Sequence, residues 1–200
     1  MLSILSFLTY FDTFQGGEVR RDADSKYAHV IVAGEGAAGN NAKALAAQAV
    51  LLTALGNSSP VKFSSATNGV IGKAAGAHGS ASAFQAVHSD SGLVGAYIVV
   101  EGAHANQAIS NVVGAFKSLK IADIEAVKKQ AYNNALRAAA HSDNYAIERT
   151  SQLFQSQDKY IELIPGVTTS EVEAAAKKLA SKLSVASYGN ISEVPYVDSL

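Results

Sequence analysis

Five histidines are the residues of this 200-residue chain that could most readily hold a metal ion or transfer a proton. None of them belongs to an H-x-x-E-H or H-x-x-H sequence, the spacings that bring two imidazoles to one face of a helix. The sequence therefore predicts no metal site. His29 lies inside an apolar run typical of a strand, and we expect it to be a hydrogen-bonded structural residue rather than a ligand. The five are His29, His78, His88, His104 and His141.

The residue types of a hydrolase triad are adjacent in His88-Ser89-Asp90. A triad needs its nucleophile, base and orienting carboxylate to converge in space, whereas neighbours on a strand and turn point in different directions. We therefore expect no catalysis at this place. No other constellation in the sequence suggests an active site, so we predict that the chain is not an enzyme and has no catalytic or cofactor-binding residues.

A literal G-x-G-x-x-G motif runs from Gly34 to Gly39, between a predicted strand and a predicted helix. A dinucleotide site needs this motif inside a parallel β-α-β unit, with an acidic residue about twenty residues further on. The chain has no acidic residue between Asn40 and His88. We interpret the motif as a glycine-rich turn from strand to helix, and we expect no cofactor.

Charge and cysteine content exclude further classes of function. With 16 basic and 17 acidic residues the formal net charge is -1, which gives no electrostatic reason to expect a nucleic acid partner. The chain has no cysteine, so it can form no disulfide, thiolate nucleophile or cysteine-type zinc site. Its hydrophobic content of 48% is enough for the core of one good-sized domain.

The N-terminal residues 1–14 form a separate apolar segment. The apolar run from Leu2 to Leu8 is far shorter than the roughly 18 residues of a membrane span, and it lacks the basic flank of a secretion signal. We expect it to pack as a short strand or helix end, and we predict no membrane span anywhere in the chain.

A hairpin around Ser89-Asp90-Ser91-Gly92 is the element around which we expect the fold to be organised. Short polar side chains favour a turn there, and Gly92 tolerates a positive φ. The run from Leu93 to Val100 is rich in β-branched and aromatic residues, and residues 81–87 are its predicted antiparallel partner. We place this pair at the centre of a sheet.

A further strand, Tyr27 to Ala33, is apolar on both faces and should lie inside the sheet. Asn40 or Asn41 can cap the helix that follows, in which Leu45, Ala49 and Leu52 form one apolar stripe. Short strands are also predicted near residues 17–21 and 183–188, and helices near residues 70–75, 105–116, 123–139, 142–154, 158–164 and 168–182.

Three later helices have clear faces or caps. Apolar residues between Ala105 and Phe116 recur at helical spacing and should cover the sheet. In the helix after Asp123, Lys128 is expected to face solvent. Thr168 and Glu171 fit a capping box.

The order of these elements predicts an α+β fold, with an antiparallel or mixed sheet covered by helices. Strands occur in hairpins and helices occur in blocks, which argues against a doubly wound parallel sheet. We expect residues 15–200 to form one domain.

Four separated stretches of the chain together form a distinctive set of motifs. They are Gly16-Gly17-Glu18-Val19-Arg20 with the Ala28-His29 strand; Val61-Lys62 with Ser65-Ala66-Thr67; Ser89-Asp90-Ser91-Gly92-Leu93-Val94-Gly95; and Ala186-Ser187-Tyr188-Gly189-Asn190 with Pro195-Tyr196-Val197-Asp198-Ser199-Leu200. In order and spacing they resemble the core proteins of mitochondrial ubiquinol-cytochrome c reductase, respiratory complex III, and above all the C-terminal half of core protein 2.

That resemblance implies both a fold and a function. Core proteins are similar to pitrilysin-type zinc peptidases and to mitochondrial processing peptidase, but they are not catalytic, and they consist of two similar α+β halves. The chain would then be one such half, a structural or assembly subunit of the respiratory chain that acts through protein-protein contacts. It would lie on the matrix side of the mitochondrial inner membrane. Its implied partners are other complex III subunits, especially core protein 1 and a second core protein 2.

Two other functions remain open. The chain could be the non-catalytic, substrate-binding half of an enzyme of the mitochondrial processing peptidase type, or a small domain that binds something unrelated. The α subunit of the processing peptidase has a conspicuous run of glycines in its substrate-binding loop, whereas residues 57–79 contain scattered glycines only. We therefore rank the structural subunit first.

Overall fold

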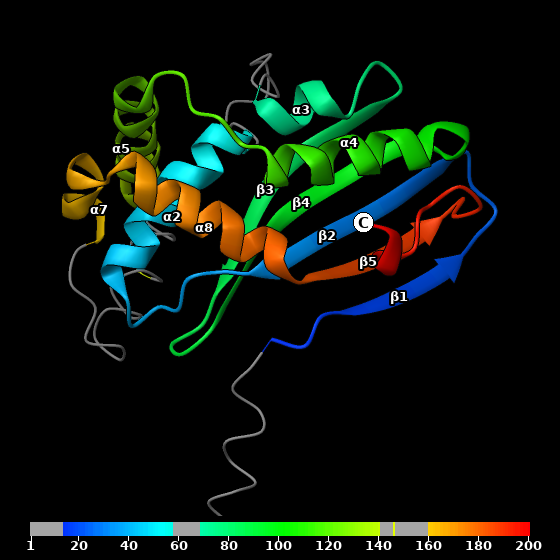
Figure 1. The fold of residues 1–200 in the computed structure, drawn as a ribbon, viewed down its shortest axis with the longest axis horizontal. Helices are drawn as coiled ribbons and strands as arrows, with labels where there is room; N and C mark the ends of the chain where they lie inside the picture. Colours follow the sequence, from blue (N-terminus) through cyan, green and yellow to red (C-terminus); the bar gives the residue numbers. More distant parts are fainter. Residues whose placement is uncertain (1–13, 58–68, 141–145, 147–159) are drawn as a thin grey trace, which may run out of the picture.

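A computed structural model of the chain describes residues 14–57, 69–140, 146 and 160–200. In these residues five strands form one mixed sheet, and helices pack on one of its faces (Figure 1). The strand order is β1-β5-β2-β4-β3; β1 and β5 are parallel, and every other neighbouring pair is antiparallel. The predicted α+β class is confirmed. The strands are β1 (Gly17–Asp22), β2 (Tyr27–Glu35), β3 (Gly79–Val87), β4 (Gly92–Glu101) and β5 (Leu183–Gly189).

The predicted hairpin is present, but its central position is wrong. Strand β2 is the middle strand, and β3 lies at the edge of the sheet. The chain leaving helix α2 (Ala42–Leu55) runs along this edge, where Ala83 donates its N–H to the carbonyl of Gly56 (2.9 Å). A high content of β-forming residues predicts that a segment is a strand, but it does not predict the position of that strand in the sheet. That position depends on pairing between segments that are far apart in the sequence.

The helices begin where the sequence predicts. Asn41 accepts a hydrogen bond from the N–H of Ala44 at the start of α2, and Thr168 forms the predicted capping box with Glu171. The other helices are α3 (Val70–Ala74), α4 (Ala105–Lys117), α5 (Ile124–Ala140), α7 (Tyr160–Leu163) and α8 (Thr169–Ser181), with short 3-10 turns η1 (Gly102–His104), η2 (Ile164–Gly166) and η3 (Val197–Ser199). The predicted N-terminal segment, except residue 14, and most of the predicted 142–154 helix lie outside the described residues.

Helices α2, α4 and α8 cover the sheet, and their apolar side chains fill the core between the two layers. The predicted α4 stripe is confirmed, since Ile109, Val112 and Phe116 are all buried. The single stripe predicted for α2 is too narrow. This helix is buried on most of its circumference, because α5, α7 and α8 pack around the sides that the sheet leaves free.

Lys128 does not face solvent as predicted. Its side chain is only 11% exposed, and its ammonium donates to the carbonyl of Pro165 (3.0 Å) and pairs with Glu125 (2.6 Å). The aliphatic stem of a lysine can lie on apolar surface while the charged end reaches a polar partner. Helix α5 uses Lys128 in this way where it meets η2.

Candidate interaction surface

The alternation of side chains along the strands gives the sheet two different faces. On β2, Ala28, Val30 and Val32 point to the helices and are fully buried. Their neighbours Tyr27 and Ile31 point to the opposite side. No helix among the described residues covers that side in the ribbon view (Figure 1). We call it the open face.

The open face carries an apolar patch. It carries five of the nine large hydrophobic side chains that are exposed among the described residues. Ile31 lies opposite Tyr97 on one neighbouring strand and opposite Ala186 on the other, so the patch is continuous across the sheet. The five, with their exposed fractions, are Val19 (68%), Tyr27 (42%), Ile31 (40%), Tyr97 (41%) and Tyr188 (51%).

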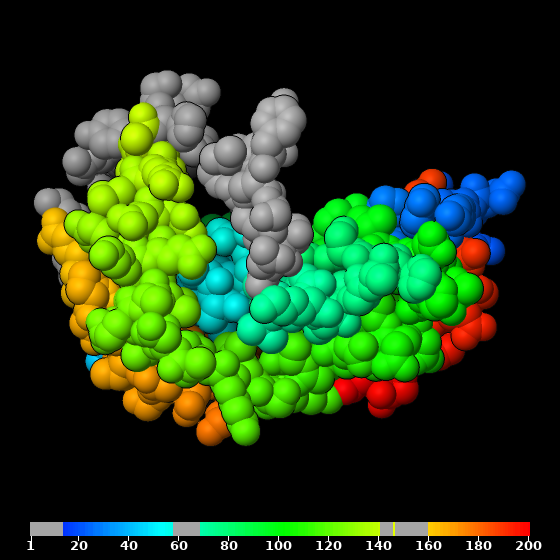
Figure 2. Space-filling model, turned by 90° about the horizontal axis from the view of Figure 1, so that it is seen from above, coloured from blue at the N-terminus to red at the C-terminus, as the bar shows by residue number. Residues whose placement is uncertain are grey.

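Continuous apolar surface of this kind marks a contact site on a soluble protein. In Figure 2, α5 (yellow-green) and β1 (blue) stand at opposite ends of the side that faces away from α4 and α8. An apolar, strand-lined surface suits a second protein surface rather than a small charged ligand. The sequence signal for it was the apolar character of both faces of β2.

His29 has the structural role predicted for it. Its Nδ1 lies 2.6 Å from the hydroxyl oxygen of Tyr97, and the two rings stack with centroids 6.1 Å apart. The pair holds the aromatic ring of Tyr97 in place on the open face. His29 is thus part of the open face.

A charged cluster fastens the C-terminal tail to β1. The Arg20 guanidinium pairs with Glu18 (2.8 Å), donates to the carbonyls of Ile191 (3.0 Å) and Val194 (2.9 Å), and lies 4.3 Å from the centre of the Tyr196 ring. The hydrogen bond from Arg20 holds the pKa of the Glu18 carboxyl below its usual value. Two of the four distinctive stretches of the sequence therefore meet at this cluster.

The glycine-rich motif contacts the hairpin turn backbone to backbone. Gly36 donates its N–H to the carbonyl of Gly92 (2.8 Å), and Gly39 donates to the carbonyl of His88 (2.7 Å). A Cβ on Gly92 would lie 2.1 Å from the carbonyl oxygen of Ala37. Gly92 is thus required by this close approach and not by a positive φ, which corrects the prediction.

The same contact supports a structural role for the motif. Strand β2, which precedes it, pairs only with antiparallel neighbours, so the parallel β-α-β unit of a dinucleotide site is not formed here. His88, Ser89 and Asp90 are exposed in the hairpin turn, where Asp90 accepts a hydrogen bond from Ser91 (3.2 Å). That is the arrangement of a turn.

A cavity of about 330 Å³ lies between α2, α8 and the glycine-rich segment. Ion pairs join the elements around it: Lys43 with Glu171 (2.8 Å) and Lys178 with Glu35 (2.9 Å). Lys43 and the Thr168 cap together lower the pKa of the Glu171 carboxyl to about 2. All four charged groups around the cavity are thus engaged with one another, which favours a role in helix packing.

The sequence is similar to those of two kinds of mitochondrial protein. The chain is 31% identical over 202 residues to mouse "Cytochrome b-c1 complex subunit 2, mitochondrial", covering 94% of the chain and 44% of the relative. It is 29% identical to "Mitochondrial-processing peptidase subunit alpha-2" of Dictyostelium discoideum, over 86% of the chain and 41% of that protein. No family model matches.

A solved structure has the same fold. A chain of "Complex III2 from Candida albicans, Inz-5 bound" superposes with a TM-score of 0.77 at 17% identity, covering 94% of this chain and 49% of that one. The chain therefore spans less than half the length of the sequence relatives described above. Over 94% of its length the chain is similar in sequence to subunit 2 of the mitochondrial cytochrome b-c1 complex, in agreement with the resemblance stated from its motifs.

Proposed function

We propose that the chain is a non-catalytic structural subunit of mitochondrial respiratory complex III and acts through protein-protein contacts. The observation that carries this proposal is the 31% identity to subunit 2 of the cytochrome b-c1 complex over 94% of the chain. The apolar open face supplies the contact surface that such a role needs. Residues 15–200 act as one domain in this proposal, because the described helices and strands share one core.

The partners follow from the same relationship. The open face binds another α+β unit of the complex, contributed by core protein 1 or by a second core protein 2. The assembly lies on the matrix side of the mitochondrial inner membrane. Among the described residues no helix is both long enough and apolar enough to cross a bilayer, so any association with the membrane through these residues is indirect.

The proposal excludes peptidase activity for this chain. Zinc peptidases of the pitrilysin type use an H-x-x-E-H sequence to hold the metal and activate water, and the 200 residues contain no such sequence. The chain by itself should therefore leave presequence peptides uncleaved.

Native gel electrophoresis of mitochondrial membranes tests the assembly directly. The chain should migrate with the other complex III subunits, and crosslinks should join the open face to a core subunit. Ile31→Glu places a charge at the centre of the open face, where the side chain is 40% exposed, and should abolish co-migration.

Leu136→Glu is the matched control, because Leu136 is equally apolar and 45% exposed but lies on α5. This variant should still co-migrate. If the wild-type chain is never found with complex III subunits, or if both variants assemble normally, the proposal fails.

A second function is favoured by one observation, the 29% identity to the α-2 subunit of a mitochondrial processing peptidase. In that case the chain would bind presequence peptides without cleaving them. Fluorescence titration with a labelled presequence peptide distinguishes the two functions, since a complex III subunit should show no saturable binding.

A further inference from the structure

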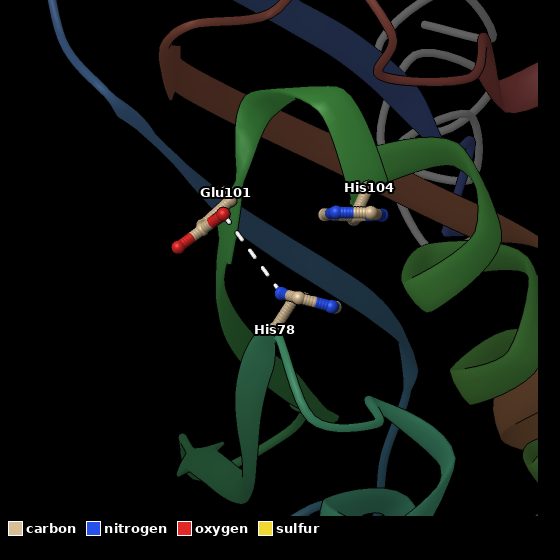
Figure 3. A group of neighbouring side chains, drawn as sticks. All are labelled: His78, Glu101 and His104. Carbon is tan, nitrogen blue, oxygen red and sulfur yellow. Dashed lines mark ion pairs between the residues drawn. The ribbon is translucent and has the colours of Figure 1, made fainter.

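His78 meets Glu101 and His104, two residues from a distant part of the sequence, where β4 leads into α4 (Figure 3). The rings of His78 and His104 stack with centroids 4.0 Å apart and an angle of 15° between their planes. One carboxylate oxygen of Glu101 lies 3.9 Å from Nδ1 of His78. One ligand atom from each residue lies within 4.8 Å of the other two.

The backbone holds the three residues in this arrangement. Glu101 donates its N–H to the carbonyl of His78 (3.1 Å), which extends the pairing between β3 and β4 by one residue. His104 follows three residues later, at the end of the 3-10 turn η1, and the next N–H, that of Ala105, bonds back to the carbonyl of Gly102. Each of the three side chains is therefore attached to backbone that hydrogen bonds already hold in place. Folding of the chain thus brings the three residues together before any metal binds.

We propose that His78, Glu101 and His104 bind a divalent transition-metal ion of the zinc class. Two imidazoles and a carboxylate are a ligand set that zinc accepts, with water in the fourth position. Bonds of about 2.0 to 2.1 Å in a tetrahedral site require ligand atoms roughly 3.3 Å apart, so the present separations must close by about 1.5 Å at most. The side chain of His78 is 56% exposed and that of Glu101 is 32% exposed, so both have room to rotate.

The ion pair between Lys26 and Glu101 leaves one oxygen of the Glu101 carboxylate available to bind a metal. Its ammonium lies 3.0 Å from Oε1 of Glu101, whereas the distance to His78 is measured from Oε2. Glu101 can therefore bind a metal through Oε2 while Oε1 stays with Lys26. Magnesium and calcium are disfavoured, because they prefer oxygen ligands and two of the three ligands here are nitrogens.

The site is separate from peptidase chemistry and does not depend on the proposed role in complex III. It revises the prediction that the chain binds no metal. Two of the three ligands could be seen in the sequence as a Glu101-x-x-His104 spacing. His78 lies beside them only because β3 and β4 pair in the register that places Gly79 opposite Val100.

Calorimetric titration of the metal-free chain with zinc at neutral pH, without a histidine tag, tests the proposal. We expect one zinc ion per chain and an increase in thermal unfolding temperature on binding. Cobalt should replace zinc and give the visible absorption of a bound, four-coordinate ion. His78→Ala, His104→Ala and Glu101→Gln should each lower the affinity by about tenfold or more, since even the loss of a residue that only hydrogen-bonds to a metal ligand costs this much.

His88→Ala is the matched control, because it removes an exposed histidine at the opposite end of β3. It should bind zinc with an affinity within about twofold of wild type, as expected for a residue outside the site. Unfolding temperatures of the metal-free variants verify that each is folded. The proposal is overturned if the wild type shows no stoichiometric binding at about 100 µM zinc, or if the three ligand variants bind as tightly as the His88 control.

Discussion

Replacing Arg20 by methionine should loosen the C-terminal tail and destabilise the domain. Methionine keeps much of the aliphatic stem but lacks the guanidinium, which donates hydrogen bonds to Glu18 and to the carbonyls of Ile191 and Val194. Hydrogen bonds from a charged donor contribute about 1.5 to 3 kcal/mol each, and losses within one cluster do not add fully. Because the side chains of Arg20 and Glu18 are only 19% and 17% exposed, solvent replaces the lost partners poorly. We expect a loss of about 2 to 4 kcal/mol in the free energy of unfolding.

Urea denaturation of the two arginine variants measures this effect. Arg21→Met is the matched control, since Arg21 is the next residue of β1 and is exposed, and it should change stability by less than about 0.5 kcal/mol. Hydrogen exchange should show lost protection at Val194 and Val197, whose N–H groups bond to Ile191 and Glu18, in Arg20→Met alone. Equal denaturation midpoints for the two variants would refute the reasoning.

Three further predictions concern the core, the hairpin and the capping box. Phe116→Ala should cost about 3 to 5 kcal/mol in denaturation experiments because the ring is 1% exposed, whereas Lys117→Ala should stay within about 0.5 kcal/mol; similar midpoints would mean that α4 faces the other way. Gly92→Ala should destabilise strongly through its backbone clash, while Gly114→Ala, with open space at its Cβ, should not; a stable Gly92→Ala protein would disprove the close approach. The pKa of Glu171 is about 2 in the folded protein against an ordinary value of 4.5, so the stabilisation that its carboxylate provides is complete above about pH 4.5 and is lost as the pH falls towards 2. The difference in unfolding free energy between wild type and Glu171→Gln should therefore shrink over that pH range. A difference that stays constant would contradict this prediction.

Local signals in the sequence were sufficient to predict most elements but not their neighbours. Asn41, Asp123 and Thr168 cap helices as expected, because a cap depends only on residues within one turn. Strand order could not be read in the same way. The strongest β signal, Leu93 to Val100, belongs to a strand that is second from the edge, since β5 arrives from the far end of the chain to pair with β2.

The candidate sites show the same division between local and long-range information. The apolar character of both faces of β2 predicted a strand inside the sheet, and β2 is indeed the middle strand, but it did not predict that Ile31 would be exposed on the open face. Lys128 was misplaced because its partner, the carbonyl of Pro165, is 37 residues away. His78 could be placed beside Glu101 only once the register of β3 and β4 was known.

Three of the distinctive stretches of this sequence fix backbone positions, and this agrees with a structural role for the chain. The turn at Gly92 is in contact with the glycine-rich segment that leaves β2, and Arg20 ties the tail to β1. Gly92 is the first residue of β4, and Arg20 lies within β1 next to Val19 of the open face. Substitution of Arg20 or Gly92 should therefore distort the open face as well as destabilise the domain. The residues that distinguish this sequence thus lie at backbone contacts that help to hold the shape of the open face.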